Sequence, residues 1–374
     1  MVIDALYILA AGLGAAFLLG VLGERQNNLA YMITLGALSF MSMVSAGWLV
    51  MFVASGAQPI EILTAGTPPP YAINLRMGLV ESALMLAINV TGLLTAMHMG
   101  EALLEKGRRA MAVLIITIMA LCGLVLTRDI FNLFVFFELI SIATGGLILL
   151  SDHDQALAAG FKYLIVSQFI SVLLLIGIVF AYHATGTLNI DGLAVAAQGL
   201  PAEATASFAL AFFMVLIAIV AELKPFPANG WALDIYEAAH PGFAAVFSAA
   251  TGTAVLFAAA KVLAIGGPGW YPVATGIGIL TFVASNLLAL PQTNDRRLLG
   301  YSSIAQTGLI LAVVGQQDIL GDQTLFVAGG LLLAHAAAKA GLFWLSACVA
   351  ERELTAWAAL KDRPRRRTVK LKRA

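Results

Sequence analysis

The stretch AELKPFPANGW (residues 221–231) interrupts a long apolar run and decides how the chain is read. About fifteen apolar residues precede it, as in a membrane-spanning helix. Proline lacks a backbone N–H donor and clashes with the preceding helical turn, so Pro225 and Pro227 should break a straight span. Either the helix ends at Glu222, or it is interrupted around Lys224 and continues.

The composition places the whole chain in a membrane. Of its 374 residues, 60% are hydrophobic and only 11% are charged, which is typical of a polytopic membrane protein. The formal net charge is zero and gives no sign of a nucleic-acid partner. Cys122 and Cys348 lie in apolar runs and are interpreted as buried small side chains rather than as a disulfide or metal site. The sequence has no phosphate loop, Rossmann glycine pattern, iron–sulfur cysteine run or haem-ligand pair, so no cofactor is expected. The first apolar run lacks a basic leader and is interpreted as a retained helix.

Eleven apolar windows are long enough to cross about 30 Å of hydrocarbon. They are residues 3–23, 29–54, 78–100, 109–127, 130–151, 156–182, 207–239, 241–264, 271–290, 298–316 and 324–349. The chain is therefore predicted to be an all-α polytopic membrane protein with about eleven transmembrane helices. Residues 55–77 are expected to form an ordered or irregular external loop, and 190–198 a short amphipathic helix.

Basic residues indicate the orientation, because cytoplasmic loops carry an excess of Lys and Arg. The connections between successive spans alternate between the two sides of the membrane. One side then carries Arg25, Lys106, Arg108, Arg109, Arg296, Arg297 and nine basic residues from Arg352 to Arg373. The other side collects Arg76, Arg128 and Lys261. This bias predicts an outside amino terminus and a cytoplasmic carboxyl terminus. It also requires residues 207–239 to cross once, which favours an interrupted helix at Lys224.

Ionisable residues inside the membrane are expensive and are functional candidates by default. Glu138 lies about eight residues into its window, hence about 12 Å deep, and four phenylalanines precede it. Burial favours the neutral form of an ionisable group unless an opposite charge is near, so such a group suits proton transfer. Lys224 is the expected partner, since interrupted helices are where transporters place ion sites. Glu222 is expected to point elsewhere and to face solvent.

Three further basic positions are candidates for a proton relay. His335 and Lys339 are four residues apart and should share one helix face, where a neutral histidine beside a lysine could pass protons. Lys162, early in its span, is interpreted either as a relay member or as an interfacial anchor. His240 precedes Pro241 and is expected to cap a helix or lie at an interface rather than act as a gate.

Five segments together resemble a known family. They are RDIFNLFVFFELISIATGGLILL, FKYLIVSQFISVLLLIGIVFAYHATGTLNI, ELKPFPANGWALDIYEAAHPG, NDRRLLGYSSIAQTGLIL and AHAAAKAGLF, in that order. The chain resembles, over about 70–349, the antiporter-like subunits of respiratory complex I, membrane-bound hydrogenases and Mrp-type Na⁺/H⁺ antiporters, the D-type Mrp subunit most of all.

The resemblance implies inverted five-helix repeats, each with a broken helix forming a half-channel. It divides the chain into N-terminal helices (1–108), a first complete repeat (109–264), a partial second repeat (271–349), and an interfacial segment with a basic tail (350–374). It places the family's proton-path glutamate at Glu138, its broken-helix lysine at Lys224, and its later histidine and lysine at His335 and Lys339. The family's Trp–x–x–Asp stretch falls on Trp231 to Asp234.

Two departures from the family pattern leave alternatives open. Gly252 stands where the family usually has a lysine, so the relay either lacks a link or uses Lys261. The second repeat also runs out before its broken helix.

The function expected is a proton- or Na⁺/H⁺-translocating subunit of a complex in the inner membrane, with other membrane subunits and either redox subunits or an Mrp assembly as partners. The alternative is a non-conducting structural or coupling subunit. Catalysis by the chain alone is not expected, and any redox chemistry would belong to partners.

Overall fold

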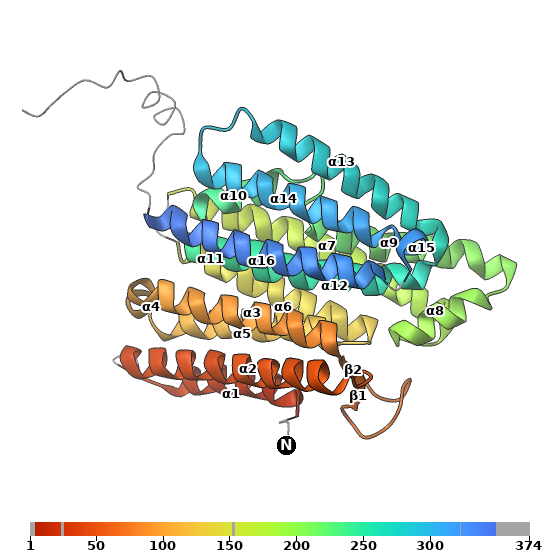
Figure 1. Ribbon diagram of the computed structural model, residues 1–374, viewed down its shortest axis with the longest axis horizontal. Coiled ribbons are helices and arrows are strands. Elements are labelled where there is room, and N and C mark those ends of the chain that lie inside the picture. The colour runs from red at the N-terminus through yellow and green to blue at the C-terminus, as the bar shows by residue number, and fades with distance from the viewer. Residues whose placement is uncertain (1–3, 24–25, 152–153, 322, 349–374) are drawn as a thin grey trace, which may run out of the picture.

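The computed structural model is a bundle of long helices that run along a common direction (Figure 1). It describes residues 4–23, 26–151, 154–321 and 323–348. The helices are α1 (Leu6–Val21), α2 (Asn27–Ser55), α3 (Leu79–His98), α4 (Gly100–Lys106), α5 (Arg108–Leu126), α6 (Ile130–Leu149), α7 (Ala156–Thr185), α8 (Ile190–Gln198), α9 (Ala202–Glu222), α10 (Gly230–Ala238), α11 (Pro241–Ala245), α12 (Gly252–Gly266), α13 (Tyr271–Ala289), α14 (Asp295–Val314), α15 (Gln317–Leu320) and α16 (Gln323–Cys348).

The predicted all-α polytopic architecture is confirmed. Within the described residues, ten helical segments are long and apolar enough to cross a membrane. The eleventh expected segment, α1, is apolar but has 16 residues, a length of about 24 Å. The expected interfacial segment and basic tail, residues 350–374, lie outside the described residues.

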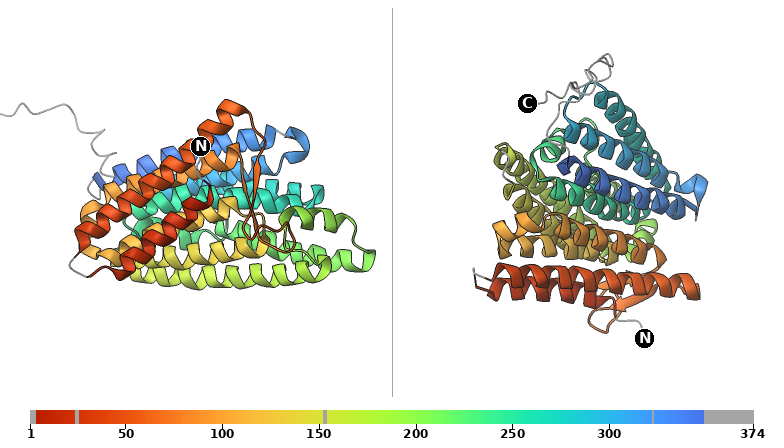
Figure 2. Two further views of the ribbon diagram at one scale, coloured as in Figure 1. Left: turned by 90° about the horizontal axis from the view of Figure 1, so that it is seen from below. Right: turned by 60° about the vertical axis from the view of Figure 1, so that its left-hand side comes forward.

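One segment forms the centre of the bundle. The stretch Pro241–Gly266 is 94% buried over its most apolar window, against 22% for the peripheral segment Pro268–Ala289. It joins α11 to α12 through a π-helical turn, Val246–Thr251. Figure 2 shows α1 and α2 as a layer on one side of the bundle, with α13 and α14 on the other. Side chains of this central segment therefore meet residues from distant parts of the chain.

The α13–α14 contact is a direct approach of two backbones. A Cβ added at Gly278 would lie 2.5 Å from the Ala312 nitrogen and 2.6 Å from the Gly308 oxygen. One added at Gly308 would lie 2.8 Å from the Gly278 oxygen. Glycine is required at both positions because no side chain fits between the helices.

One end of the bundle, here called the hairpin end, carries β1, β2, α8 and α15 (Figure 1). Of the two alternatives expected for 55–77, the structure shows an ordered connection, in which β1 (Ile60–Leu63) pairs antiparallel with β2 (Asn74–Met77). Pairing satisfies backbone groups that a loose loop would leave to water. The backbone N–H of Arg128 donates to the Asn74 carbonyl at 3.1 Å, which ties the hairpin to the α5–α6 turn. The short helix expected at 190–198 is confirmed as α8.

Candidate functional site around an interrupted helix

The chain breaks its helix between Glu222, the last residue of α9, and Gly230, the first residue of α10. Lys224 has a φ of 63°, in the left-handed region that non-glycine residues seldom adopt. Pro225 and Pro227 lie within the break, where they remove two backbone donors. The backbone N–H of Phe226 donates to Thr281 Oγ1 of α13 at 3.2 Å. The interruption expected from the sequence is therefore present and is held by a neighbouring helix.

Both charged side chains beside the break are buried. Glu222 is 2% exposed and Lys224 is 3% exposed. The Lys224 Nζ lies 3.8 Å from the centroid of the Phe247 ring, a geometry in which the ring face attracts a cation. The Tyr163 hydroxyl donates to Glu222 Oε1 at 3.5 Å, while Glu222 Oε2 has no hydrogen-bond partner among the described residues. The expectation that Glu222 faces solvent is wrong.

Three aromatic rings enclose this pair of charges. Tyr163 stacks on Trp231 with 5.5 Å between centroids, and its ring lies edge-on to Phe247 at 6.0 Å. Trp231 and Phe247 are 6.3 Å apart. The rings come from α7, α10 and the π-helical turn, so they converge only in the folded bundle. They border a break at which Glu222 and Lys224 are only 2% and 3% exposed, so bulk water does not reach the two charges.

A row of hydroxyl groups continues from the aromatic rings. The Tyr236 hydroxyl is 3.4 Å from Ser303 Oγ, which is 2.7 Å from Ser248 Oγ on the π-helical turn. π-Helical turns are rare and occur frequently at functional sites. This row brings α10, α14 and the central segment together at one buried polar point.

His335 and Lys339 lie on α16 beside this polar row. They are 4% and 5% exposed. The backbone of Ser248 lies next to the His335 ring, and Lys339 Nζ donates to Ser302 Oγ at 2.6 Å. The structure thus brings both residues, expected on one helix face, to the same buried region as the break.

Gly252 leaves room for a β-carbon at the position where the family pattern has a lysine. A Cβ added there would lie 3.8 Å from His335 Nε2 and 3.8 Å from a methyl carbon of Thr307, both ordinary contact distances. No amine therefore projects from residue 252 toward His335.

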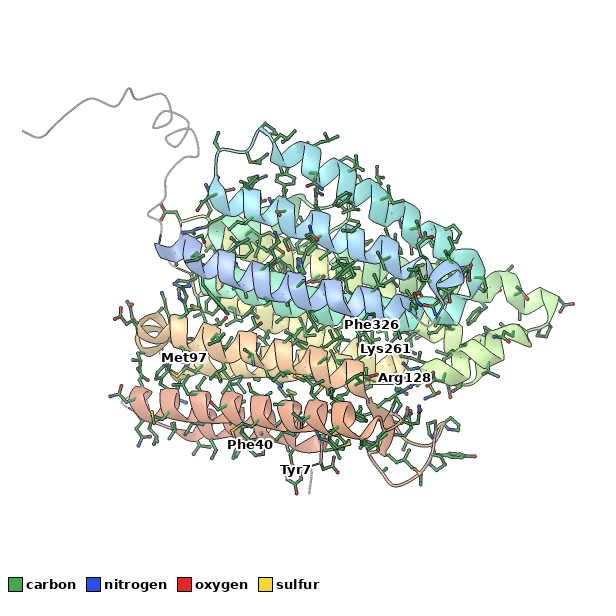
Figure 3. All side chains as sticks on the ribbon, in the orientation of Figure 1. Tyr7, Phe40, Met97, Arg128, Lys261 and Phe326 are labelled. Carbon is green, nitrogen blue, oxygen red and sulfur yellow. The ribbon has the colours of Figure 1, made fainter. Side chains whose placement is uncertain are left out.

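Lys261 is buried but lies toward the hairpin end (Figure 3). Its Nζ donates to the carbonyls of Leu124, Val125 and Thr127 at 2.8, 3.0 and 2.9 Å. These carbonyls end α5 and have no partner within that helix. Lys261 therefore caps α5 and is not part of the group around Lys224.

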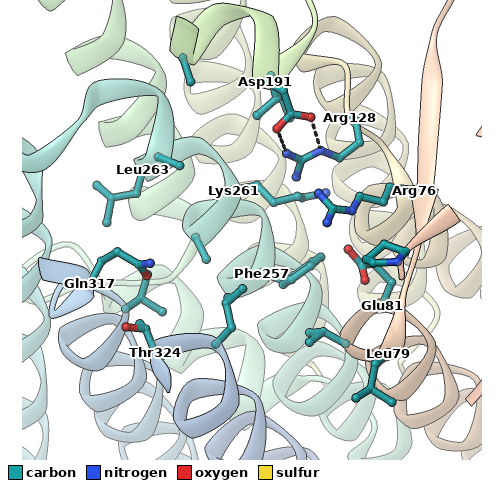
Figure 4. Close-up of a pocket in the computed structure, with 18 of the residues that line it drawn as sticks. Arg76, Leu79, Glu81, Arg128, Asp191, Phe257, Lys261, Leu263, Gln317 and Thr324 are labelled. Atoms are coloured by element: carbon teal, nitrogen blue, oxygen red, sulfur yellow. Dashed lines mark hydrogen bonds and ion pairs between the residues drawn. The ribbon is translucent and has the colours of Figure 1, made fainter. Parts of the chain in front are cut away.

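A cavity of about 400 Å³ adjoins Lys261 (Figure 4). Its charged lining residues are Arg76, Glu81, Arg128, Asp191 and Lys261. Figure 4 shows the Arg128 guanidinium paired with the Asp191 carboxylate. The cavity gives Lys261 a charged surrounding at the hairpin end.

The turn that Lys261 caps holds another buried acid. Asp129 Oδ1 accepts from the backbone N–H of Asn132 at 2.8 Å and caps α6. Burial raises the pKa of the Asp129 carboxyl, while hydrogen bonds from the backbone of Asn132 and Phe131 oppose that rise.

Glu138 lies half-buried on α6, at the outer side of the bundle. Its Oε1 accepts from Gln168 Nε2 of α7 at 2.7 Å, and its Oε2 has no hydrogen bond within the described residues. Leu139 and Phe169, next to these two residues, are 36% and 72% exposed. No hydrogen bond or ion pair joins Glu138 to Lys224 in the described part of the chain. The pair expected from the sequence is thus separated.

Lys162 lies at the opposite end of the bundle from the hairpin. It pairs with Asp234 of α10 and is 55% exposed. Arg297 also contacts Asp234, at 3.2 Å, and contacts Glu237 at 2.9 Å. Nearby, His240 accepts from the backbone N–H of Gly242 and caps α11, which confirms the capping interpretation.

Sequence reasoning missed Tyr163 and misplaced Glu222. On a continuous helix, side chains two positions apart point in directions about 200° apart, which would separate Glu222 from Lys224. The helix instead ends at Glu222, and Lys224 turns back with its left-handed backbone. The signal available in the sequence was the second ionisable residue, Glu222, beside the proline break.

A membrane bundle with a helix broken at a buried lysine, and with further buried amines beside it, defines the class of polytopic proteins with discontinuous helices. Comparison with known families places the chain more narrowly. The family described as "NADH:quinone oxidoreductase/Mrp antiporter, TM" matches residues 127–363. The chain belongs to this family.

Related proteins agree with this assignment. Subunit N of the NADH-quinone oxidoreductase of Desulforudis audaxviator is 29% identical over 302 residues, 77% of this chain and 58% of the relative. The corresponding subunit of Ectopseudomonas mendocina is 29% identical over 311 residues, 81% of this chain and 60% of the relative. The chain therefore spans about three fifths of the length of these relatives.

Two solved structures share the fold. A chain of the membrane-bound sulfane sulfur reductase, an archaeal respiratory membrane complex, superposes with a TM-score of 0.82 at 28% identity, covering 91% of this chain and 69% of that one. A chain of the Mrp complex from Dietzia sp. DQ12-45-1b superposes with a TM-score of 0.81 at 24% identity, covering 91% and 62%.

Proposed function

We propose that this chain is a proton-translocating membrane subunit of a multi-subunit complex, either a redox-driven pump of the complex I or membrane hydrogenase type or an Mrp-type antiporter. One observation carries the proposal: four buried ionisable side chains, Glu222, Lys224, His335 and Lys339, surround a broken helix and a row of hydroxyl groups. Buried ionisable groups in a membrane mark ion pathways more often than they stabilise a fold.

The buried ionisable groups outline a proton path that runs from Lys224 past His335 to Lys339. The Lys224 amine lies over the Phe247 ring and the His335 imidazole lies next to the Ser248 backbone, so both groups lie against the central π-helical turn. Lys339 follows one turn along α16. A proton arriving at Lys224 can therefore move toward Lys339 through groups that exchange protons, with Ser303 and Ser248 as hydroxyl links. Water would bridge the remaining gaps.

Glu138 is assigned the role of interface group. It is half-buried near the exposed face of α6; one carboxylate oxygen accepts from Gln168, and the other is buried without a hydrogen-bond partner within the described residues. Lipid alone would leave this carboxylate poorly solvated. The relatives are named as subunits or components of membrane complexes. A neighbouring membrane subunit packed on the exposed face of α6 would bring its charges close to Glu138 and couple them to the central path.

We also propose that the spans are organised as five-helix repeats. The spans α5, α6, α7, α9 with α10, and α11 with α12 supply five crossings between residues 108 and 266. This set corresponds to the first five-helix repeat expected at 109–264. The spans α13, α14 and α16 would then begin a second repeat at 271–349.

The experiment measures proton transport by the assembled complex in inside-out vesicles. Glu138→Gln and Lys224→Ala should each lower the initial rate by about tenfold or more, because each removes a proton-exchanging group. Glu203→Gln is the matched control, since Glu203 is exposed in the first turn of α9. Wild-type rates for both variants in a fully assembled complex would reject the proposed function. Repeating the measurement with and without Na⁺ distinguishes the antiporter from the pump.

A non-conducting coupling subunit is the second candidate. Gly252 favours it, because no lysine reaches His335 from that position. The engagement of Lys261 by three carbonyls also favours it, because that amine caps a helix. In that case Lys224→Ala would leave transport intact, while deletion of the whole subunit would prevent assembly of the complex.

A further inference from the structure

Glu222 is a buried acid without a full set of partners. It ends α9, is 2% exposed, and accepts one long hydrogen bond, 3.5 Å from the Tyr163 hydroxyl. Its second oxygen has no hydrogen bond within the described residues. Acids are almost never fully buried unless they are paired. A carboxyl group that only supported the fold would be expected to bond with both oxygens.

The break turns an amine back toward this acid. Lys224 follows two residues later, and its left-handed backbone directs the side chain over the Phe247 ring. Tyr163, which holds Glu222, also contacts Phe247. An acid and an amine therefore share one water-poor compartment bordered by Tyr163 and Phe247.

Hydroxyl groups lead from Glu222 toward α6. Ser141 and Thr144 of α6 lie near the Tyr163 hydroxyl, and they are 1% and 5% exposed. They follow Glu138 on α6 by one and two helical turns. A row of Glu138, Ser141, Tyr163 and Glu222 thus crosses from the outer side of α6 to the break.

We propose that Glu222 is a second proton-carrying acid of this chain, placed between Glu138 and Lys224, and that Tyr163 is its positioning residue. The assignment rests on the proposed function and adds a station to it. In the transfer, the N–H bond of the Lys224 ammonium breaks and an O–H bond forms on Glu222, leaving a neutral amine and a neutral acid. The reverse transfer restores both charges.

The test uses the assembled complex in inside-out vesicles, with Glu222→Gln as the first variant. This substitution keeps size and hydrogen bonding but cannot exchange a proton, so the transport rate should fall by about tenfold or more. The matched control is Glu203→Gln, an exposed glutamate on the same helix, which should transport like wild type. Glu222→Asp, which keeps an exchangeable acid, should recover part of the rate.

An infrared difference spectrum recorded during turnover supplies a readout that a structural role would not change. A protonated-carboxyl band should appear in the wild type and be absent from Glu222→Gln. The band should shift in Tyr163→Phe, because this substitution removes the hydroxyl that donates to Glu222 Oε1. If Glu222→Gln does not assemble, the same band is tested in Glu222→Asp and Tyr163→Phe, and an unchanged band in both overturns the proposal.

The two proposals fail differently. Normal transport in Glu222→Gln combined with loss of transport in Lys224→Ala overturns the role of Glu222 and leaves the proposed function standing. Normal transport in Glu222→Gln and Lys224→Ala, both assembled, overturns both.

Discussion

Lys224 and Lys261 are both buried amines, but the structure satisfies them in different ways. Lys224 lies over an aromatic face and makes no hydrogen bond through its amine within the described residues. Lys261 donates all three of its amine hydrogens to backbone carbonyls. Three carbonyl acceptors fix the Lys261 amine in one position, whereas no carbonyl acceptor holds the Lys224 amine within the described residues. The residue type alone does not separate these roles.

Replacing Lys261 by methionine should destabilise the protein. The substitution keeps an unbranched side chain but leaves three buried carbonyls unpaired, so a loss of about 1–3 kcal/mol in unfolding free energy is expected. Lys162→Met removes an exposed ion pair and should cost about 0–1 kcal/mol. Thermal unfolding in detergent, followed by circular dichroism, compares the two. A transport defect in Lys261→Met at unchanged stability would instead place Lys261 in the proton path.

Individual helices are positioned by features that a hydropathy window does not contain. The broken helix is stabilised from outside, because Thr281 of α13 accepts the free N–H of Phe226. The helix α13 is mostly exposed to the surroundings, and its close approach at Gly278 fixes it against α14. The break therefore depends on a contact made three residues away along α13.

Gly278→Ala tests this dependence. An added methyl group would lie 2.5 Å from the Ala312 backbone, so the helices must separate at a cost of about 1–3 kcal/mol. Gly276→Ala is the control, because a Cβ there meets nothing within 4 Å. Unfolding in detergent measures both. Equal stability of the two variants would contradict the close packing of α13 on α14.

The whole molecule has two chemically different ends. Lys106, Arg108 and Arg297 lie at the end opposite the hairpin, whereas Arg76 and Arg128 lie at the hairpin end. The positive-inside rule then orients the hairpin outward and the opposite end toward the cytoplasm. This orientation in the inner membrane remains a proposal, with the amino terminus outside and the carboxyl terminus in the cytoplasm.

Single cysteines test the orientation in intact cells. Thr67→Cys in the hairpin and Thr293→Cys between α13 and α14 are both at exposed positions. In a background without Cys122 and Cys348, a membrane-impermeant maleimide should label residue 67 in intact cells and residue 293 only after lysis. The opposite pattern would invert the topology.

The amino-acid sequence by itself determined the all-α polytopic class, the order of the eleven apolar segments, the short helix at 190–198 and the interruption at Pro225 and Pro227. These features depend on local properties, namely apolar run length and the missing donor of proline. Only the tertiary structure decided which side chains meet. Glu222 bonds to a residue 59 positions earlier, and Lys261 caps carbonyls more than 130 positions earlier. Such contacts depend on how each helix is rotated and packed against its neighbours, which hydropathy along the chain does not encode.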